Sequence, residues 1–244
     1  MRQMDLLKAE QAALNNAVWC ETVCAAHGCS GEWREAAWIN RRQTPPFYPN
    51  AVTWGSSSGS LTHQECIHEL LQAGLPPGWG VKDSFRALEL EALGFRMLFV
   101  AGWLYLPSAT PLRESASLDA SWEVIKTAVA LEEWEKAWSG DSGVRNIFVP
   151  QILDNDNVAF LAARRQGQIV AGCIANRDAE CVGISNLFLP IEESVELRLG
   201  CIANARSAFP ELPLVGYESG ADLDAMKELD FEVVGELCVW FHEG

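Results

Sequence analysis

The stretch LPLVGYESGADLDAMKELDFEVVGELCVWF, residues 212–241, contains four successive local patterns. A short apolar run, 214–215, leads into the turn-like sequence GYESG at 216–220. Three apolar residues then recur at the spacing of one buried helix face: Leu223, Met226 and Leu229. A run rich in Val, Leu, Trp and Phe follows and ends at Phe241. The stretch therefore predicts a strand, a turn, a compact helix and a second strand.

The same order of patterns occurs earlier in the chain, over residues 79–105. There the tetrapeptide Val81–Lys82–Asp83–Ser84 matches Gly216–Tyr217–Glu218–Ser219. Gly94–Phe95 likewise matches Asp230–Phe231, and the two matches differ by one residue in offset. We interpret this similarity as a weak internal duplication with a one-residue gap.

The remaining segments predict alternating helices and strands. In the first half we expect a helix over 5–27, a strand over 51–54, a Gly/Ser-rich loop over 55–60 and a helix beyond it. In the second half we expect a helix over 118–138 and a strand over 147–149. A hairpin of 158–164 and 168–175 should turn at Arg165–Gln166–Gly167. A strand over 181–189 and a helix over 195–209 precede the opening stretch.

The ending GYESG, then a helix, then FEVVGEL and Trp240 resembles the C-terminal portion of a GNAT-type N-acyltransferase. The resemblance covers residues 147–241 and, as a truncated copy, residues 51–105. It implies an α/β (α+β) fold with a mixed sheet, built from two GNAT-like halves packed together. The expected domains are 1–110, a truncated half with a leading helix, and 111–244, joined by the proline-bounded segment 107–111.

Composition limits the classes of partner. The chain has 244 residues, of which 49% are hydrophobic, and a formal net charge of −15. This charge argues against nucleic acid and against an anionic membrane surface, because both would be repelled. No run approaches the ~18 apolar residues of a membrane span, and the N-terminus has no secretory pattern, so we expect a cytoplasmic protein. The eight cysteines are expected to be reduced, and four of them lie in apolar runs: Cys173, Cys181, Cys201 and Cys238.

The resemblance implies acetyl-CoA as cofactor, bound by backbone amides between a strand end and the next helix. In the second half this places cofactor contacts at Leu187, Phe188 and Leu189. The loop that follows departs from the family pattern, because 186–194 contains no glycine but has Pro190 and two glutamates. The equivalent loop of the first half suggests Gly55, Ser57 and Gly59 as cofactor contacts. The alternative for that loop is an ordinary Ser/Gly connection.

Tyr217 and Glu218, at the end of the penultimate strand, are the predicted catalytic residues. Family members often use a tyrosine as general acid and a glutamate or a water as general base. Lys82 and Asp83 are the counterparts of these residues in the first half. The alternative is that Tyr217 only packs, with its hydroxyl bonded to backbone.

A possible metal site was considered at Cys20, Cys24, His27 and Cys29, but their spacing matches no standard zinc pattern. We therefore predict no metal.

The aromatic and basic segment before residue 50 resembles the N-terminal part of an uncharacterised bacterial group of GNAT-like proteins. It suggests a pocket for an anionic or aromatic ligand, lined by Trp38, Arg41, Arg42 and Tyr48. The alternative is that these residues pack the loop onto the sheet.

The function that follows is transfer of an acetyl group from acetyl-CoA to a small amine, with direct attack and no covalent enzyme intermediate. One alternative is a catalytically inactive GNAT-like protein that binds a small ligand. Another is a structural or interaction protein, which would leave several of the ten tryptophans exposed. A homodimer is a further expectation.

Overall fold

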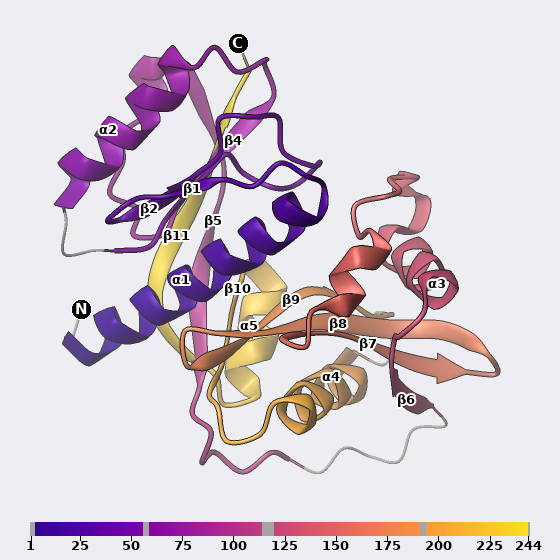
Figure 1. The fold of residues 1–244 in the computed structure, drawn as a ribbon. Coiled ribbons are helices and arrows are strands. Elements are labelled where there is room, and N and C mark those ends of the chain that lie inside the picture. The colour runs from indigo at the N-terminus through magenta and orange to yellow at the C-terminus, as the bar shows by residue number, and fades with distance from the viewer. Residues whose placement is uncertain (1–2, 56–58, 114–119, 191–193, 244) are drawn as a thin grey trace.

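The structure of the chain is a computed structural model, which describes residues 3–55, 59–113, 120–190 and 194–243 (Figure 1). Its strands form one 11-stranded sheet in the order β1-β2-β3-β4-β11-β5-β10-β9-β8-β7-β6. The strands are β1 Glu32–Trp33, β2 Ala37–Ile39, β3 Ala51–Thr53, β4 Trp79–Asp83, β5 Phe95–Leu106, β6 Ser121–Val124, β7 Val158–Arg165, β8 Gln168–Asp178, β9 Cys181–Phe188, β10 Leu214–Glu218 and β11 Glu232–His242. The α-helices are α1 Gln3–Ala26, α2 Gly59–Gln72, α3 Ala128–Ser139, α4 Ser194–Ala208 and α5 Gly220–Glu228. Short 3-10 turns are η1 Glu91–Leu93, η2 Gly140–Ser142 and η3 Pro150–Asp154. The mixed sheet confirms the predicted α/β class.

Two similar units lie on either side of the sheet's centre. In the first, β3 runs parallel to β4 and is connected to it through α2, and in the second β9 runs parallel to β10 and is connected through α4. The last strand of each unit is exchanged: β5 pairs with β10, and β11 pairs with β4. The two exchanged strands also pair with each other along most of their length. The sheet is therefore continuous, and β4 and β10 hold equivalent places on opposite sides of the β11–β5 pair.

The helices cover both faces of the sheet. Alternate residues of β5 show the two faces, because Trp103 packs with the alanines of α1 whereas Leu104 packs with α4 and α5. Helices α1 and α3 lie on the first face, and α2, α4 and α5 lie on the second. In Figure 1 α1 crosses the middle of the sheet, in contact with strands of both units. This placement brings α1 side chains close to both β4 and β10.

Several predicted elements are confirmed with their turns. The hairpin of β7 and β8 turns at Gln166 and Gly167, whose φ values of 50° and 81° are those of a tight hairpin turn. The strand, helix and strand predicted from residues 212–241 are β10, α5 and β11, and the strand expected over 181–189 and the helix expected over 195–209 are β9 and α4. In the N-terminal half, however, β2 is a strand that was not predicted, and it forms through its pairing with β3.

Three local predictions were wrong. The expected helix inside 79–105 is only η1, because the Asp83 carboxylate accepts hydrogen bonds from Phe85 N and Leu88 N and holds the chain in turns. The helix expected over 118–138 begins at Ala128, capped by Thr127, and β6 occupies its expected first turns. The strand expected over 147–149 is a bend.

That bend is held by a buried carboxylate. Glu135 of α3 is 4% exposed and accepts three backbone hydrogen bonds, from Asn146 N at 2.8 Å, Ile147 N at 2.6 Å and Phe148 N at 2.9 Å. These amides consequently do not need a neighbouring strand. The bend places Phe148 against the aromatic cluster of α3 and β7.

Replacing Glu135 by Ala should lower the free energy of unfolding by about 3 kcal/mol, because two buried backbone amides and a part-buried one lose their acceptor. Chemical denaturation of the variant and of the wild type would measure the difference. Glu132→Ala, at an exposed position of the same helix, is the control and should change stability by less than about 0.5 kcal/mol. Equal losses in the two variants would contradict the role given to Glu135.

Candidate active site

Strands β9 and β10 separate towards their C-terminal ends. Their ladder pairs Leu214 with Val182 and Val215 with Gly183 and goes no further. Both strands nevertheless continue, β9 to Phe188 on its other partner β8 and β10 to Glu218 on β5. Beyond Gly183 the backbone of β9 therefore has no ladder pairing with β10, although the Ile184 carbonyl still lies close to Gly216.

A bulge in β9 accompanies this separation. Between β8 and β9 the register shifts, with Ile174 opposite Ser185 and Gly172 opposite Phe188. Asn186 lies within the shift and has a φ of 53°, in the left-handed region that asparagine tolerates better than most residues. Bulges bend a strand and increase its twist, which turns the end of β9 away from β10.

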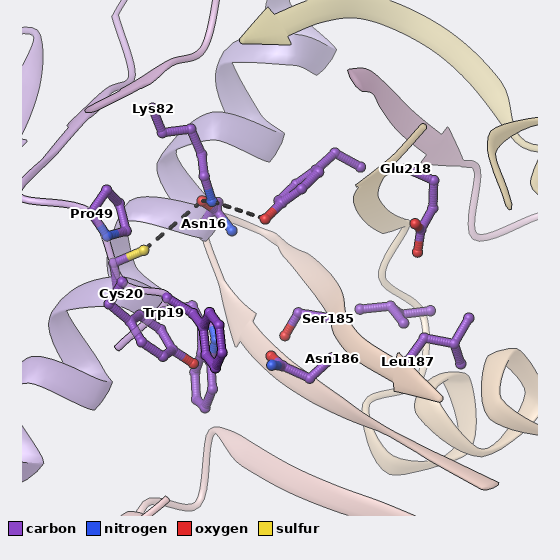
Figure 2. Close-up of a pocket in the computed structure, with 13 residues that line it drawn as sticks. Asn16, Trp19, Cys20, Pro49, Lys82, Ser185, Asn186, Leu187 and Glu218 are labelled. Atoms are coloured by element: carbon purple, nitrogen blue, oxygen red, sulfur yellow. Dashed lines mark hydrogen bonds between the residues drawn. The ribbon is translucent and has the colours of Figure 1, made fainter. Parts of the chain in front are cut away.

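A cavity of about 280 Å³ lies beside the separated strands. One wall is formed by β9 and the end of β10, and the other by α1, by the loop after β2 and by Lys82 of β4. Figure 2 shows the lining residues: Asn16, Trp19, Cys20, Phe47, Tyr48, Pro49, Lys82, Ile184, Ser185, Asn186, Leu187, Tyr217 and Glu218. The cavity thus combines residues from both units of the sheet with residues of α1.

Lys82 and Tyr217 meet at the centre of this site. The Lys82 ammonium donates to Asn16 Oδ1 at 2.7 Å and to the Tyr217 hydroxyl at 3.2 Å (Figure 2). It also lies 4.5 Å from the centre of the Tyr217 ring. The two residues occupy equivalent positions in the strands β4 and β10 of the two units. Two different polar side chains at these positions therefore face each other.

The Lys82 ammonium is a buried cation with neutral partners. Lys82 is 6% exposed, and in the described part of the chain no carboxylate forms an ion pair with it. Burial disfavours its charge, but interaction with Tyr217 and Cys20 leaves the pKa of Lys82 raised above its usual value. Neither of its two hydrogen-bond partners, Asn16 Oδ1 and the Tyr217 hydroxyl, is a carboxylate.

Glu218 lies in the same cavity with an altered ionisation. Burial, and secondly the negative charge of Asp222, raise the pKa of Glu218 to about 7, although the Arg198 guanidinium opposes the shift. Arg198 is itself paired with Asp222 at 2.6 Å. A carboxyl group that titrates near neutral pH can both accept and release a proton under ordinary conditions.

Two buried hydroxyl groups in the cavity lack a hydrogen-bond partner within the described residues. They are Ser185 Oγ on β9 and the Tyr48 hydroxyl in the loop after β2. Buried polar atoms in native proteins are nearly always paired. These two are consequently available to a bound molecule.

The predicted ligand-binding residues of the N-terminal segment divide between two environments. Tyr48 lines the cavity. Trp38 is fully buried in the core, where its ring nitrogen donates to Glu21 Oε2 at 2.8 Å. Arg41 pairs with Glu69 at 2.6 Å, and Arg42 donates to the Gly28 carbonyl at 3.2 Å. The structure therefore does not bring these four residues to one place.

The predicted cofactor contacts also differ in position. Leu187 lines the cavity, whereas Phe188 packs edge-to-face on Trp134 with ring centroids 5.2 Å apart. Leu189 packs against a small cluster next to Ala171 and Leu197. Residues 191–193 of the following loop, including both glutamates, lie outside the described residues.

In the first unit the equivalent loop begins at Gly55, which does not line the cavity of Figure 2. Strands β3 and β4 remain joined at this end, because Ser84 N donates to Thr53 Oγ1 at 2.8 Å. Gly59 is the first residue of α2, and Ser57 lies outside the described residues. The parallel strands of the first unit are therefore not separated at Ser84 as those of the second unit are.

The residues considered for a metal have other contacts. Cys20 and Cys24 are buried, Cys29 Sγ donates to the Cys24 carbonyl at 3.2 Å, and His27 Nε2 lies 2.9 Å from the Ile147 carbonyl. Within the described ranges no three His, Cys, Asp or Glu side chains gather as metal ligands would.

Lys82, Asn16 and Ser185 are polar residues of the site that were not among the predicted catalytic and binding residues. The alignment of the two repeat copies already placed Lys82 against Tyr217. Asn16 belongs to an Asn–Asn pair within an otherwise apolar part of α1, and its neighbour Asn15 is 2% exposed. Buried amides on such a helix indicate polar partners, but not which partners.

Comparisons with solved structures define the class of fold. Over 96% of both chains, the protein is similar to a GCN5-related N-acetyltransferase from Kribbella flavida, with a TM-score of 0.60 and 13% identity. A GCN5-related N-acetyltransferase from Sphaerobacter thermophilus gives a TM-score of 0.53 at 10% identity, over 96% of this chain and 92% of that one. A functionally unknown conserved protein from Staphylococcus epidermidis gives a TM-score of 0.57 at 11% identity, over 88% of this chain and 95% of that one. The protein thus has the fold of the GCN5-related N-acetyltransferases, as the resemblance predicted.

The sequence itself matches no protein-family model and no curated protein. Identities of this size establish the fold alone, so the function depends on the site.

Two further observations concern an interaction protein with exposed tryptophans and a membrane-spanning helix. All ten tryptophans lie in the described ranges, and only Trp33, at 44%, is among the exposed large hydrophobic residues. This distribution does not favour a broad aromatic binding face. No described helix has the length and apolar character needed to cross a bilayer.

Proposed function

We propose that the protein is an N-acetyltransferase that moves an acetyl group from acetyl-CoA to a small amine. The observation that carries this proposal is the separation of β9 from β10 beside a cavity that contains both Tyr217 and Glu218. The separated strands offer unpaired backbone groups, and the two side chains offer an acid and a base. The fold of the GCN5-related N-acetyltransferases supports the same function.

The residues present suit an acyl-thioester arm. Backbone groups of β9 between Ser185 and Leu187 have no partner strand on the β10 side, and Ser185 Oγ is buried without an acceptor or donor. An extended chain with amide groups could satisfy them as an added strand would. Bound acetyl-CoA would supply the acetyl group as an activated thioester.

The chain's own residues supply the proton transfers. The Glu218 carboxylate is placed to accept the proton that the attacking amine loses, either directly or through a water. The Tyr217 hydroxyl is placed to donate a proton to the sulfur that leaves. The Lys82 ammonium, 3.2 Å from that hydroxyl, stabilises the negative charge that develops on the phenol oxygen. None of the eight cysteines is needed as a nucleophile.

Calorimetric titration with acetyl-CoA tests the proposal, and micromolar binding is expected. Ser185→Phe should remove measurable binding, because the ring would fill the cavity beside β9. Ser108→Phe is the matched control, since Ser108 is exposed in the loop after β5, beyond the opposite end of β10. Absence of heat up to millimolar acetyl-CoA would contradict the proposal. Binding without turnover of any amine would instead favour the inactive ligand-binding alternative.

A further inference from the structure

A second cavity, of about 540 Å³, adjoins the first. Its size lies within the ~300–1,000 Å³ of typical small-molecule pockets. The two cavities share five lining residues: Phe47, Tyr48, Pro49, Lys82 and Tyr217. A molecule in the second cavity would therefore reach Tyr217 and the Lys82 ammonium from the side opposite the separated strands.

The rest of the second cavity is mainly apolar. Prolines 45 and 46, Leu75 and Trp79 form one part, and Leu98, Phe99 and Phe241 form another. Leu98 and Phe99 on β5 are 43% and 41% exposed, and Phe47 is 71% exposed. Large apolar side chains that remain exposed around a cavity indicate an apolar ligand group.

The charged residue that lines this cavity is Lys82, the buried cation described above, and Gln43, Thr44 and Asn50 are further polar residues of the lining. Lys82 uses two of its three ammonium hydrogens on the neutral acceptors Asn16 and Tyr217. Burying a charge without a counter-charge is unfavourable, and an anion from a ligand would remove that cost.

We propose that the acceptor is a free α-amino acid with a large apolar, preferably aromatic, side chain. Its carboxylate would pair with Lys82, its side chain would occupy the apolar cavity, and its amine would lie towards Tyr217 and Glu218. The Tyr48 hydroxyl, which lines both cavities without a partner, offers a further hydrogen bond. This inference rests on the proposed acetyl transfer for its chemistry, but not for its binding site.

In the reaction, the amine nitrogen forms a bond to the acetyl carbon while the carbon–sulfur bond of the donor breaks. The electron pair of that bond leaves with the sulfur, which receives a proton from Tyr217. The nitrogen loses one proton to Glu218. The products are an N-acetylamino acid and free coenzyme A, with no oxidation or reduction.

The test compares two acceptors that differ only in the carboxylate, L-phenylalanine and phenethylamine. We expect kcat/KM for phenylalanine to exceed that for phenethylamine by at least about 30-fold, the lower end for a desolvated charge pair. Lys82→Met should slow both acceptors, because Lys82 also stabilises the charge on the Tyr217 oxygen. Phenylalanine should lose about 30-fold more kcat/KM than phenethylamine, so that its preference disappears. If both acceptors lose kcat/KM equally and the preference remains, Lys82 does not bind the carboxylate, and the proposal is overturned.

Leu98→Asp provides a second variant at an exposed position, where folding is not at risk. It should raise the KM for both acceptors and leave the dissociation constant of acetyl-CoA unchanged. Val129→Asp, at a 70% exposed apolar position on α3, is the control and should change neither. An unchanged KM for both acceptors in Leu98→Asp would contradict the placement of the apolar group.

Direct titration of the protein with phenylalanine, without acetyl-CoA, separates the two proposals. The protein could bind phenylalanine in a way that depends on Lys82 and yet acetylate no amine. That result would support the ligand site and contradict the proposed activity. Turnover of phenethylamine at least as fast as phenylalanine would sustain the activity and overturn the proposed acceptor class.

Discussion

Glu218→Gln is expected to lower kcat/KM for acetyl transfer by about 10²- to 10³-fold, the effect of losing a general base. The wild-type rate should rise with pH through about 7, because burial and Asp222 raise the pKa of Glu218 to that value and the base must be ionised. The glutamine cannot titrate, so the variant should lose this rise. Initial rates with a fixed acceptor between pH 5.5 and 8.5 would measure both effects. A variant that keeps the wild-type pH profile would exclude Glu218 as the base.

The same carboxyl group should also affect stability, in a direction that does not depend on activity. Glu218 binds its proton more tightly in the folded chain, with a pKa of about 7, than at the ordinary value of 4.5. Its contribution to stability is therefore fully present below about pH 4.5 and is lost as the pH rises through about 7. Relative to the wild type, Glu218→Gln should gain melting temperature between pH 5 and pH 8. A difference in melting temperature between variant and wild type that stays constant over this pH range would contradict the raised pKa of Glu218.

Tyr217→Phe is expected to reduce kcat by about 10²-fold or more while the dissociation constant of acetyl-CoA changes little. The substitution removes only the hydroxyl, which is the proton donor and the second partner of Lys82 at 3.2 Å. The packing of the ring against Trp103, with centroids 5.5 Å apart, should remain. Single-turnover kinetics together with calorimetry would separate the chemical step from binding.

The matched control for this substitution is Tyr105→Phe on β5. Tyr105 also has a lysine over its ring, Lys8 at 4.6 Å, but it lines neither of the two cavities. It should retain wild-type kcat. Equal effects of the two substitutions would mean that the loss arises from the fold and not from a proton donated by Tyr217.

The order of elements around Leu214–Phe241 was predictable because each segment carries its own periodicity and turn residues. Leu223, Met226 and Leu229 face one side of α5, and the hairpin of β7 and β8 turns where Gly167 allows a positive φ. Where a distant partner decides the local structure, prediction from the sequence failed. The bend at Ile147 depends on the carboxylate of Glu135, and β2 depends on its pairing with β3.

The sequence by itself determined the class of fold and pointed to Tyr217 and Glu218 at the end of β10. The alignment of residues 79–105 with the opening stretch also paired Lys82 with Tyr217 as equivalent positions. Only the tertiary structure decided that these positions meet, because the final strands of the two units are exchanged and α1 crosses the sheet between them. A contact between residues 135 positions apart depends on strand pairing along the whole sheet, which no local pattern encodes. The same physical reason separates Trp38, which is buried in the core, from Tyr48, which lines the site.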